Sequence, residues 1–228
     1  MTKPGFTRGN RYLFSPEIWT WNLPSGYTCP GARACFAVTN RETGRMTKGK
    51  HAEFKCYSAV TERYPAVRAK SWANYDAIRD LDKWAIVDVL FALMPRDPSL
   101  VRIHAAGDYW SQDYFDAWLV VCEAMPETRF WAFTKSLPYW ISRIGHIPPN
   151  LMMTASYGGK HDQLIAQHGL KYARVVYSEE EARMLGLPID TDDRLAAYSN
   201  DPFALLENFS RRKLQRQLPM ASPRYDTP

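Results

Sequence analysis

The chain has 228 residues, of which 46% are hydrophobic and 23% are charged, and these values are typical of a globular protein with room for one domain. They exclude wholesale disorder, and no run reaches the ~20 apolar residues that a membrane span needs. The net charge of +5 permits an anionic partner such as nucleic acid without requiring one. The first residues contain no apolar segment of a secretory signal, so we expect a cytoplasmic protein without a membrane partner, whose oligomeric state the sequence does not indicate.

The first third of the chain contains one short predicted strand, an irregular segment and a helical region. The strand covers residues 18–21, and the segment over residues 23–57 is rich in Gly, Pro, Thr and Lys without a clear period. A long irregular stretch inside a domain is usually functional or disordered. Three of the four cysteines lie in this one, which favours function. Apolar residues at helical spacing then predict helices over residues 57–94, and Pro95 ends them.

The middle of the chain alternates between short apolar runs and helical patterns. The runs predict strands at residues 100–104, 129–133, 151–154 and 173–177. Ser111 is a predicted helix cap, and Ser178 with Glu181 forms a predicted capping box. Strands that alternate with helices at this spacing indicate βα units around a parallel sheet.

These units predict an α/β fold, namely a partial or minimal (β/α) barrel-like parallel sheet with an irregular N-terminal cysteine loop. There are too few units for a full eight-fold barrel, and an open doubly wound sheet is the alternative. We expect residues 1–210 to form a single domain that includes a metal-binding loop at 23–57. Residues 211–228 form a basic tail, whose candidate nucleic-acid-binding residues are Arg211, Arg212, Lys213 and Arg216.

The clustered cysteines are candidate metal ligands. Their spacing is Cys29-x5-Cys35-x20-Cys56, and His51 lies close to the third. Three thiolates suit an iron–sulfur cluster with one open iron, and three thiolates with His51 suit a closed structural zinc site. The remaining alternative is that these cysteines are unrelated small buried residues. Cys122 lies within an apolar helical stripe, where a core position is expected.

Polar residues follow the predicted strands, whose carboxyl ends share one rim of a parallel sheet. Asp108 and His104 are the candidate acid–base pair, with Asp108 as a general base, nucleophile or ligand, and Lys135 is the third candidate catalytic residue. The candidate substrate- or cofactor-binding residues are Ser136, Ser156, Gly158, Gly159 and Tyr177. Each also has a structural alternative, such as a helix cap, a core hydrogen bond or a turn.

Several strings in this chain resemble one phage family, called gene product eighty-eight. They are TCPGARAC at 28–35, FKCYS at 54–58, IHAAGDYWSQDYFDAW at 103–118, FTKSLPYW at 133–140 and TASYGG at 154–159. The resemblance spans about residues 12–195 and implies an actinobacterial virus or prophage as origin and the host cytoplasm as location.

Two looser resemblances imply chemistry. The opening strand, cysteine loop and βα series are similar to phage proteins related to radical S-adenosylmethionine enzymes, which makes S-adenosylmethionine a possible cofactor, although the Cys-x3-Cys-x2-Cys spacing of those enzymes is absent. The chain is also similar to 7-deazaguanine transglycosylases, which are barrels with a Cys3His zinc site. That likeness implies Asp108 as nucleophile and Cys29, Cys35, His51 and Cys56 as zinc ligands.

Together these features predict a phage-type iron–sulfur or zinc enzyme that modifies nucleic acid by base modification or base exchange. The alternative is a non-enzymatic phage factor that binds DNA or a host protein and has a structural metal site.

Overall fold

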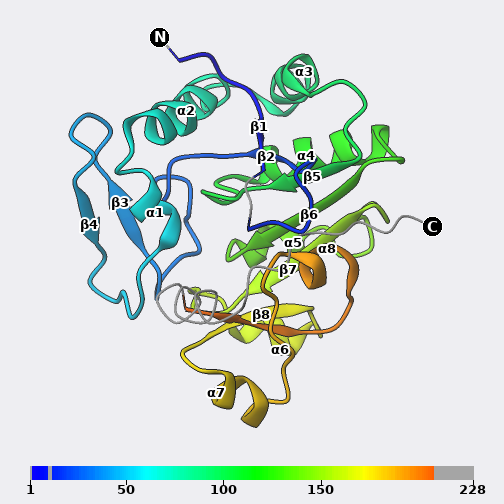
Figure 1. Ribbon diagram of the computed structural model, residues 1–228. Coiled ribbons are helices and arrows are strands. Elements are labelled where there is room, and N and C mark those ends of the chain that lie inside the picture. Colours follow the sequence, from blue (N-terminus) through cyan, green and yellow to red (C-terminus); the bar gives the residue numbers. More distant parts are fainter. Residues whose placement is uncertain (1, 10–11, 208–228) are drawn as a thin grey trace.

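A seven-stranded sheet in the order β1-β2-β5-β6-β7-β8-β9 organises the chain (Figure 1). The computed structural model describes residues 2–9 and 12–207. The strands of this sheet are β1 (Thr7–Arg8), β2 (Trp19–Trp21), β5 (Leu100–Ile103), β6 (Arg129–Thr134), β7 (Leu151–Ser156), β8 (Tyr172–Val176) and β9 (Phe203–Leu206). The six strands from β2 to β9 are parallel, and β1 is antiparallel to β2.

The strand order follows the chain from β2 to β9 without a reversal. A doubly wound sheet reverses its order at a switch point, so that alternative does not apply. The predicted parallel sheet is present, but a barrel is not, because no pairing between the edge strands β1 and β9 joins the described strands into a closed ring. The structure is therefore an α/β protein with an open, mostly parallel sheet that is wound in one direction.

The helices begin where the sequence supplies caps. The Asp82 carboxylate accepts bonds from the amides of Trp84 and Ala85, and Ser111 caps the long helix after β5, as predicted. Ser178 accepts a bond from the Glu181 amide, which confirms that cap. The helices are α1 (Tyr57–Thr61), α2 (Pro65–Asp76), α3 (Lys83–Leu93), α4 (Gln112–Ala124), α5 (Leu137–Ile141), α6 (Gln163–Gln167), α7 (Glu179–Met184) and α8 (Arg194–Tyr198).

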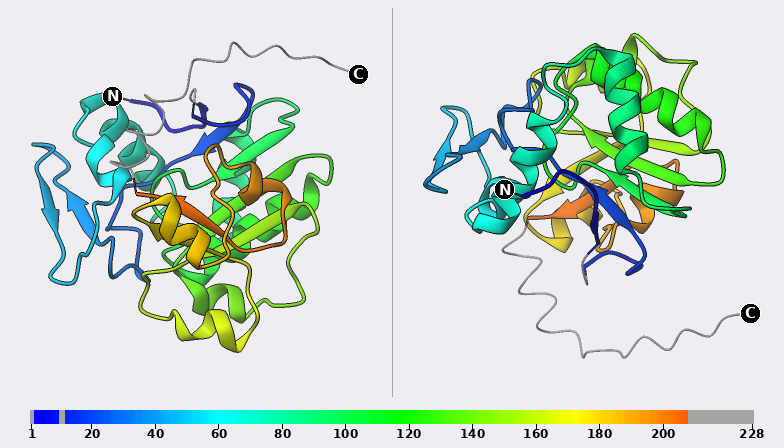
Figure 2. Two further views of the ribbon diagram at one scale, coloured as in Figure 1. Left: turned by 60° about the horizontal axis from the view of Figure 1, so that its bottom comes forward. Right: turned by 90° about the horizontal axis from the view of Figure 1, so that it is seen from above.

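Both faces of the sheet are covered, because adjacent residues of a strand point to opposite sides. Phe130 packs in the main core with Trp118 of α4, whereas its neighbour Trp131 packs with Ala197 of α8. Helices α4 and α8 therefore lie on opposite faces (Figure 2). None of the helices in the described ranges is long and apolar enough to cross a membrane.

Two segments differ from their sequence-based predictions. The segment at 23–57 is not wholly irregular, because β3 (Ala37–Thr39) and β4 (Met46–Lys48) pair in an antiparallel hairpin within it. The Phe203–Leu206 segment, for which the sequence predicts no strand, forms the edge strand β9. The predicted basic tail at 211–228 lies outside the described residues.

Candidate functional site

The segment that carries Cys29 and Cys35 lies on the carboxyl-terminal rim of the sheet. The amides of Arg33 and Ala34 donate to the Gly158 carbonyl oxygen at 3.3 and 2.8 Å. The Lys160 amide donates to the Gly31 carbonyl at 2.8 Å, and residues 32 and 159 form an isolated antiparallel bridge. Backbone hydrogen bonds thus fasten the cysteine segment to the loop after β7.

Glycines allow this close contact. A Cβ atom on Gly31 would lie 2.0 Å from the Lys135 carbonyl oxygen, which no side chain can satisfy without a backbone shift. Gly158 has φ +92°, and a Cβ atom there would lie 3.0 Å from the Cβ of Ala34. We expected Gly158 and Gly159 to admit a ligand. What they approach in the structure is the backbone of the chain's own cysteine segment.

Cys29, Cys35 and Cys56 lie close enough together for the charge of one thiolate to affect the pKa of another. All three are free and half-buried, whereas Cys122 is on the buried face of α4 in the core, as expected. Burial raises the pKa of Cys29 most, and the charges of Asp108 and Cys56 raise it further. Burial also raises the pKa of Cys56, to which Cys35 contributes, against an opposing effect of the Ala59 amide. Neighbouring thiols therefore disfavour the anionic forms of Cys29 and Cys56.

The cysteines do not form a ready-made metal site. Within residues 2–9 and 12–207, no three His, Cys, Asp or Glu side chains are grouped closely enough to hold a metal ion. His51, the expected fourth ligand, is exposed and belongs to no such group. The metal-binding prediction consequently rests on the chemistry of the three thiols and their common location.

Asp108 is buried beside the cysteine segment, in the loop between β5 and α4. Its carboxylate accepts bonds from the Thr134 hydroxyl at 2.6 Å, the Tyr109 amide at 2.7 Å and the Lys135 amide at 2.8 Å. Burial raises the pKa of Asp108, and these three hydrogen bonds oppose the rise. The carboxylate thus links the ends of β5 and β6 and acts electrostatically on Cys29.

The polar residues after β6 and β7 meet at the same rim. The Lys135 ammonium group donates to the Ser156 hydroxyl and, at 3.2 Å, to the Ser156 carbonyl. Ser136 is buried and donates to the Tyr109 carbonyl at 2.6 Å, so its hydroxyl already has an acceptor. Tyr177 follows β8 and is 53% exposed. The structure therefore brings Lys135 and Ser156 together beside Asp108, and Ser136 fixes the loop.

His104 lies in the core on the face of the sheet that α4 covers. Its side chain is 3% exposed, its Nε2 is 2.7 Å from the Tyr114 hydroxyl, and Tyr109 packs edge-on against it. Burial, with a smaller effect of Arg102, lowers the pKa of His104 to about 3. An imidazole that is neutral and enclosed at pH 7 favours a structural role for His104 over the expected acid–base role.

A polar group that was not predicted from the sequence lies below the rim, on the face of the sheet that α8 covers. Arg102 forms an ion pair with Asp193 at 2.9 Å, and its Nη2 lies 3.4 Å from the Tyr57 hydroxyl. That hydroxyl donates to the Ala105 carbonyl, so the residue after Cys56 is tied to the end of β5. The sequence feature that indicates this polar group is an arginine between the apolar residues Val101 and Ile103 of a predicted strand.

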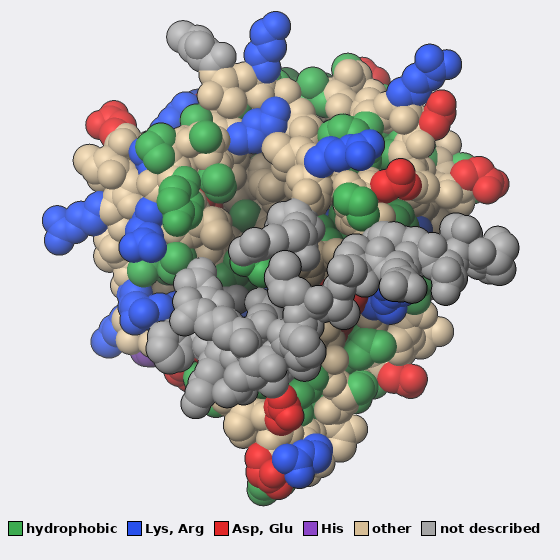
Figure 3. All heavy atoms as spheres, viewed as in Figure 1, with side chains coloured by type: hydrophobic (Ala, Val, Ile, Leu, Met, Phe, Trp, Pro, Cys, Tyr) green, Lys and Arg blue, Asp and Glu red, His purple; other side chains and the backbone are tan. Residues whose placement is uncertain are grey.

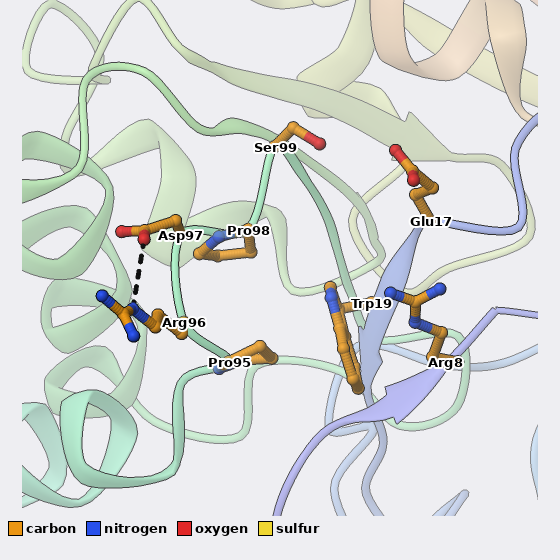
Figure 4. Close-up of a pocket in the computed structure, with 8 residues that line it drawn as sticks. All are labelled: Arg8, Glu17, Trp19, Pro95, Arg96, Asp97, Pro98 and Ser99. Carbon is orange, nitrogen blue, oxygen red and sulfur yellow. Dashed lines mark ion pairs between the residues drawn. The ribbon is translucent and has the colours of Figure 1, made fainter.

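A shallow depression lies at the opposite, amino-terminal edge of the sheet (Figure 4). It encloses about 440 Å³ and includes Trp19 at the start of β2 and Ser99 just before β5. Arg8 stacks on Trp19 at 5.1 Å, and Arg96 pairs with Asp97 on the surface at 3.5 Å. Parallel α/β folds hold their chemistry at the carboxyl rim, so this depression is not the candidate site.

Comparisons with known proteins identify phage relatives. Residues 3–217 match the sequence profile of a protein family described as Gene product 88. The "Gene 88 protein" of Mycobacterium phage D29 and that of Mycobacterium phage L5 are each 30% identical over 125 residues, or 50% of this chain. The matched part spans 45% and 46% of those two proteins, less than half of their length. No solved structure matches the chain.

Replacement Gly31→Ala tests the docking of the cysteine segment. The added methyl group would meet the Lys135 carbonyl, and overpacking of this kind costs about 1–3 kcal/mol, or roughly tenfold or more in the opening equilibrium. We therefore expect native-state alkylation of Cys29, Cys35 and Cys56 by iodoacetamide to accelerate roughly tenfold. Gly145→Ala is the control, since Gly145 has positive φ but open space. Equal alkylation rates in both variants would contradict the docking.

Replacement His104→Asn tests the buried imidazole. The folded pKa of about 3 lies below the ordinary value of 6.5, so unfolding takes up a proton as the pH falls from 6.5 toward 3. Stability from this group is complete above pH 6.5 and is lost below it, by up to about 1.4 kcal/mol per pH unit. Asp108, with its raised pKa, has the opposite dependence. Asn tolerates the φ of +64° at this position.

Urea unfolding at several pH values between about 4 and 6.5 measures this effect. The free energy of unfolding of His104→Asn should fall less steeply with decreasing pH than that of the unaltered chain. Exposed His146→Asn is the matched control and should keep the original slope. An unchanged slope in His104→Asn would show that His104 does not titrate as a buried group.

Proposed function

This chain belongs to the Gene product 88 family, and we propose from the residues at the rim that it is a metalloenzyme that modifies nucleic acid. Cys29, Cys35 and Cys56 hold the metal centre, and Asp108 and Lys135 act beside it. The observation that carries this proposal is the gathering of three half-buried thiols and a buried carboxylate at the carboxyl rim of the parallel sheet.

The three thiols of Cys29, Cys35 and Cys56 are chemically suited to a metal that prefers sulfur ligands. The thiolates of Cys29 and Cys56 are disfavoured by neighbouring thiols, and that of Cys29 also by Asp108, as long as no cation is present. A bound cation reverses this interaction, because it attracts every one of these anionic groups. Zinc and iron–sulfur clusters are the metal centres that prefer thiolates. Metal binding then draws together three side chains that are near but not yet grouped.

The position of His51 favours an iron–sulfur cluster over a closed zinc site. Without that exposed imidazole, the chain offers three thiols, which leaves one coordination position for a substrate or cofactor such as S-adenosylmethionine. The cysteine segment also follows the first of six parallel strands that are wound in one direction. That order supports the resemblance to proteins related to radical S-adenosylmethionine enzymes more than the resemblance to transglycosylases.

The chain's own residues supply proton transfer and charge at this site. Burial raises the pKa of the Asp108 carboxyl group, so it is a stronger proton acceptor than an exposed aspartate, and proton transfer is the role proposed for it. Lys135 carries its positive charge at the same rim and is held there by Ser156. A positive charge beside a general base suits an anionic substrate.

Nucleic acid is the proposed substrate, and its support is the positive net charge together with the phage family. The basic residues Arg211, Arg212, Lys213 and Arg216, outside the described ranges, remain proposed contacts. The alternative proposal is a non-enzymatic phage factor that uses the same thiols for a structural metal. Catalytic turnover of a nucleic acid substrate is expected of the metalloenzyme and not of the non-enzymatic factor.

Anaerobic purification with metal and sulfide analysis tests the metal centre. We expect about one metal centre per chain, with iron and acid-labile sulfide in similar amounts and absorbance near ~400 nm. Cys29→Ala, Cys35→Ala and Cys56→Ala should each lose most of the metal, whereas Cys122→Ala, in the core, should retain it. Zinc without sulfide would select the zinc form. Folded wild-type protein that takes up neither metal would overturn the proposal.

Replacement Asp108→Asn tests the proposed chemistry. Mass spectrometry of nucleosides from cells that express the chain should reveal a new nucleoside, and the variant should form it about 10²–10⁴-fold more slowly. Thr134→Val is the positioning control, since it removes a hydrogen bond to Asp108 but keeps the carboxylate; its loss should be smaller. A wild-type rate in Asp108→Asn would remove this residue from the reaction, and no new nucleoside from metal-loaded protein would favour the non-enzymatic factor.

A further inference from the structure

Most of the chain's net charge is concentrated in one projecting element. Residues 33–55, which we call the basic hairpin, contain β3, β4 and their flanks, with six basic and two acidic residues, a net +4 of the chain's +5. The six basic side chains are all exposed; they are Arg33, Arg41, Arg45, Lys48, Lys50 and Lys55. Figure 1 shows the hairpin at the side of the molecule, and Figure 3 shows Lys and Arg side chains gathered there.

These charges are largely unneutralised. Among the described residues, Arg41 is the one member of the six with an ion pair, to Asp76, and it also stacks on Trp72. Self-repulsion between basic residues of one hairpin has a stability cost that the fold itself does not require. A concentrated positive charge without acidic partners indicates a polyanionic ligand.

The basic hairpin is fixed beside the candidate site. The amides of Arg33 and Ala34, at the base of the hairpin, donate to the Gly158 carbonyl in the loop after β7, and the Thr39 hydroxyl donates to the Ala59 carbonyl of α1 at 2.8 Å. Cys35 lies in the first flank of the hairpin, and Cys56 follows its last residue. A polyanion bound along the hairpin therefore lies next to the thiols and Asp108.

The exposed aromatic residues favour nucleic acid over an anionic membrane. Membrane-surface elements add exposed apolar side chains to their positive charge. Within residues 23–64, the large exposed hydrophobic side chains are Tyr27, Tyr57 and Tyr64, and none lies on the hairpin. Tyrosine rings beside basic residues suit stacking with nucleic acid bases.

We propose that the basic hairpin is the principal nucleic-acid-binding element of the chain, which contacts the phosphate backbone and delivers the strand to the rim. This inference rests on the proposed function for its substrate class. It assigns the main phosphate contacts to Arg45, Lys48 and Lys50 and not to the C-terminal basic residues.

Fluorescence anisotropy with a labelled oligonucleotide tests this assignment in the full-length protein. The probes are a mixed-sequence DNA strand of about 20 nucleotides and its duplex, at salt concentrations from about 50 to 200 mM. The test variant is Arg45→Gln/Lys48→Gln/Lys50→Gln. The control, Lys83→Gln/Arg96→Gln/Arg183→Gln, removes the same charge from α3, the loop after it and α7. A third variant replaces Arg211, Arg212, Lys213 and Arg216 by Gln.

The hairpin variant should bind about tenfold or more weakly, and its slope of log K against log salt should fall by about 0.7 for each lost contact to the single strand. The charge-matched control should stay within about threefold of wild type. Binding lost in the C-terminal variant but not in the hairpin variant would overturn the inference, as would equal losses in the hairpin variant and the control. Hairpin-dependent binding to phosphatidylserine vesicles without DNA binding would also overturn it.

Metal analysis of the same samples separates this inference from the proposed function. The hairpin variant should keep its metal content, because none of its three residues is a proposed ligand. Wild-type protein that lacks metal but shows hairpin-dependent DNA binding would contradict the metalloenzyme and leave the hairpin assignment intact. Metal-loaded protein without DNA binding would contradict the hairpin assignment and leave the metal centre intact.

Discussion

The backbone contact between Gly31 and the loop after β6 is the constraint on which the candidate site depends. A side chain at position 31 would collide with the Lys135 carbonyl, so the cysteine segment can reach the rim only through glycine. The hydrogen bonds to Gly158 hold the same segment against the loop after β7. Together these contacts place the cysteine segment at the rim of the sheet, where Asp108 and the other two thiols raise the pKa of Cys29.

The same backbone contact holds the proposed metal-binding thiols beside the proposed proton-transfer residues. Asp108 is held by donors from β6 and its following loop, so the carboxylate and Lys135 are positioned by one set of hydrogen bonds. The basic hairpin is continuous in sequence with the segment that carries Cys29 and Cys35. Substrate binding, metal and proton transfer are thus proposed for one continuous surface of the chain, in which the sheet provides the rigid base.

Much of the fold was predictable, because strands between capped helices have strong local signals. The four central strands and the caps at Ser111 and Ser178 are confirmed. The edge strand β9 and the hairpin were missed, since Phe203–Leu206 lies beyond the regular alternation of apolar runs and helical patterns and the hairpin lies in a Gly- and Lys-rich stretch without clear alternation. Closure of a sheet depends on long-range pairing, which no local pattern reports.

The candidate site was predictable in composition but not in arrangement. Polar residues after the strands did meet at one rim, as Asp108, Lys135 and Ser156 show. His104 follows β5 equally, but its left-handed backbone, φ +64°, places the ring among Tyr109 and Tyr114 in the core. The Gly158–Gly159 pair looked like a ligand contact, and only the fold reveals that the cysteine segment occupies that space.

The central claim is that the three thiols form one metal centre at the rim, and X-ray absorption spectroscopy of the anaerobically metal-loaded protein tests it most directly. Coordination by Cys29, Cys35 and Cys56 predicts a first shell dominated by sulfur at about 2.3 Å, with no imidazole nitrogen from His51. A first shell of nitrogen and oxygen, with at most one sulfur, would contradict the account.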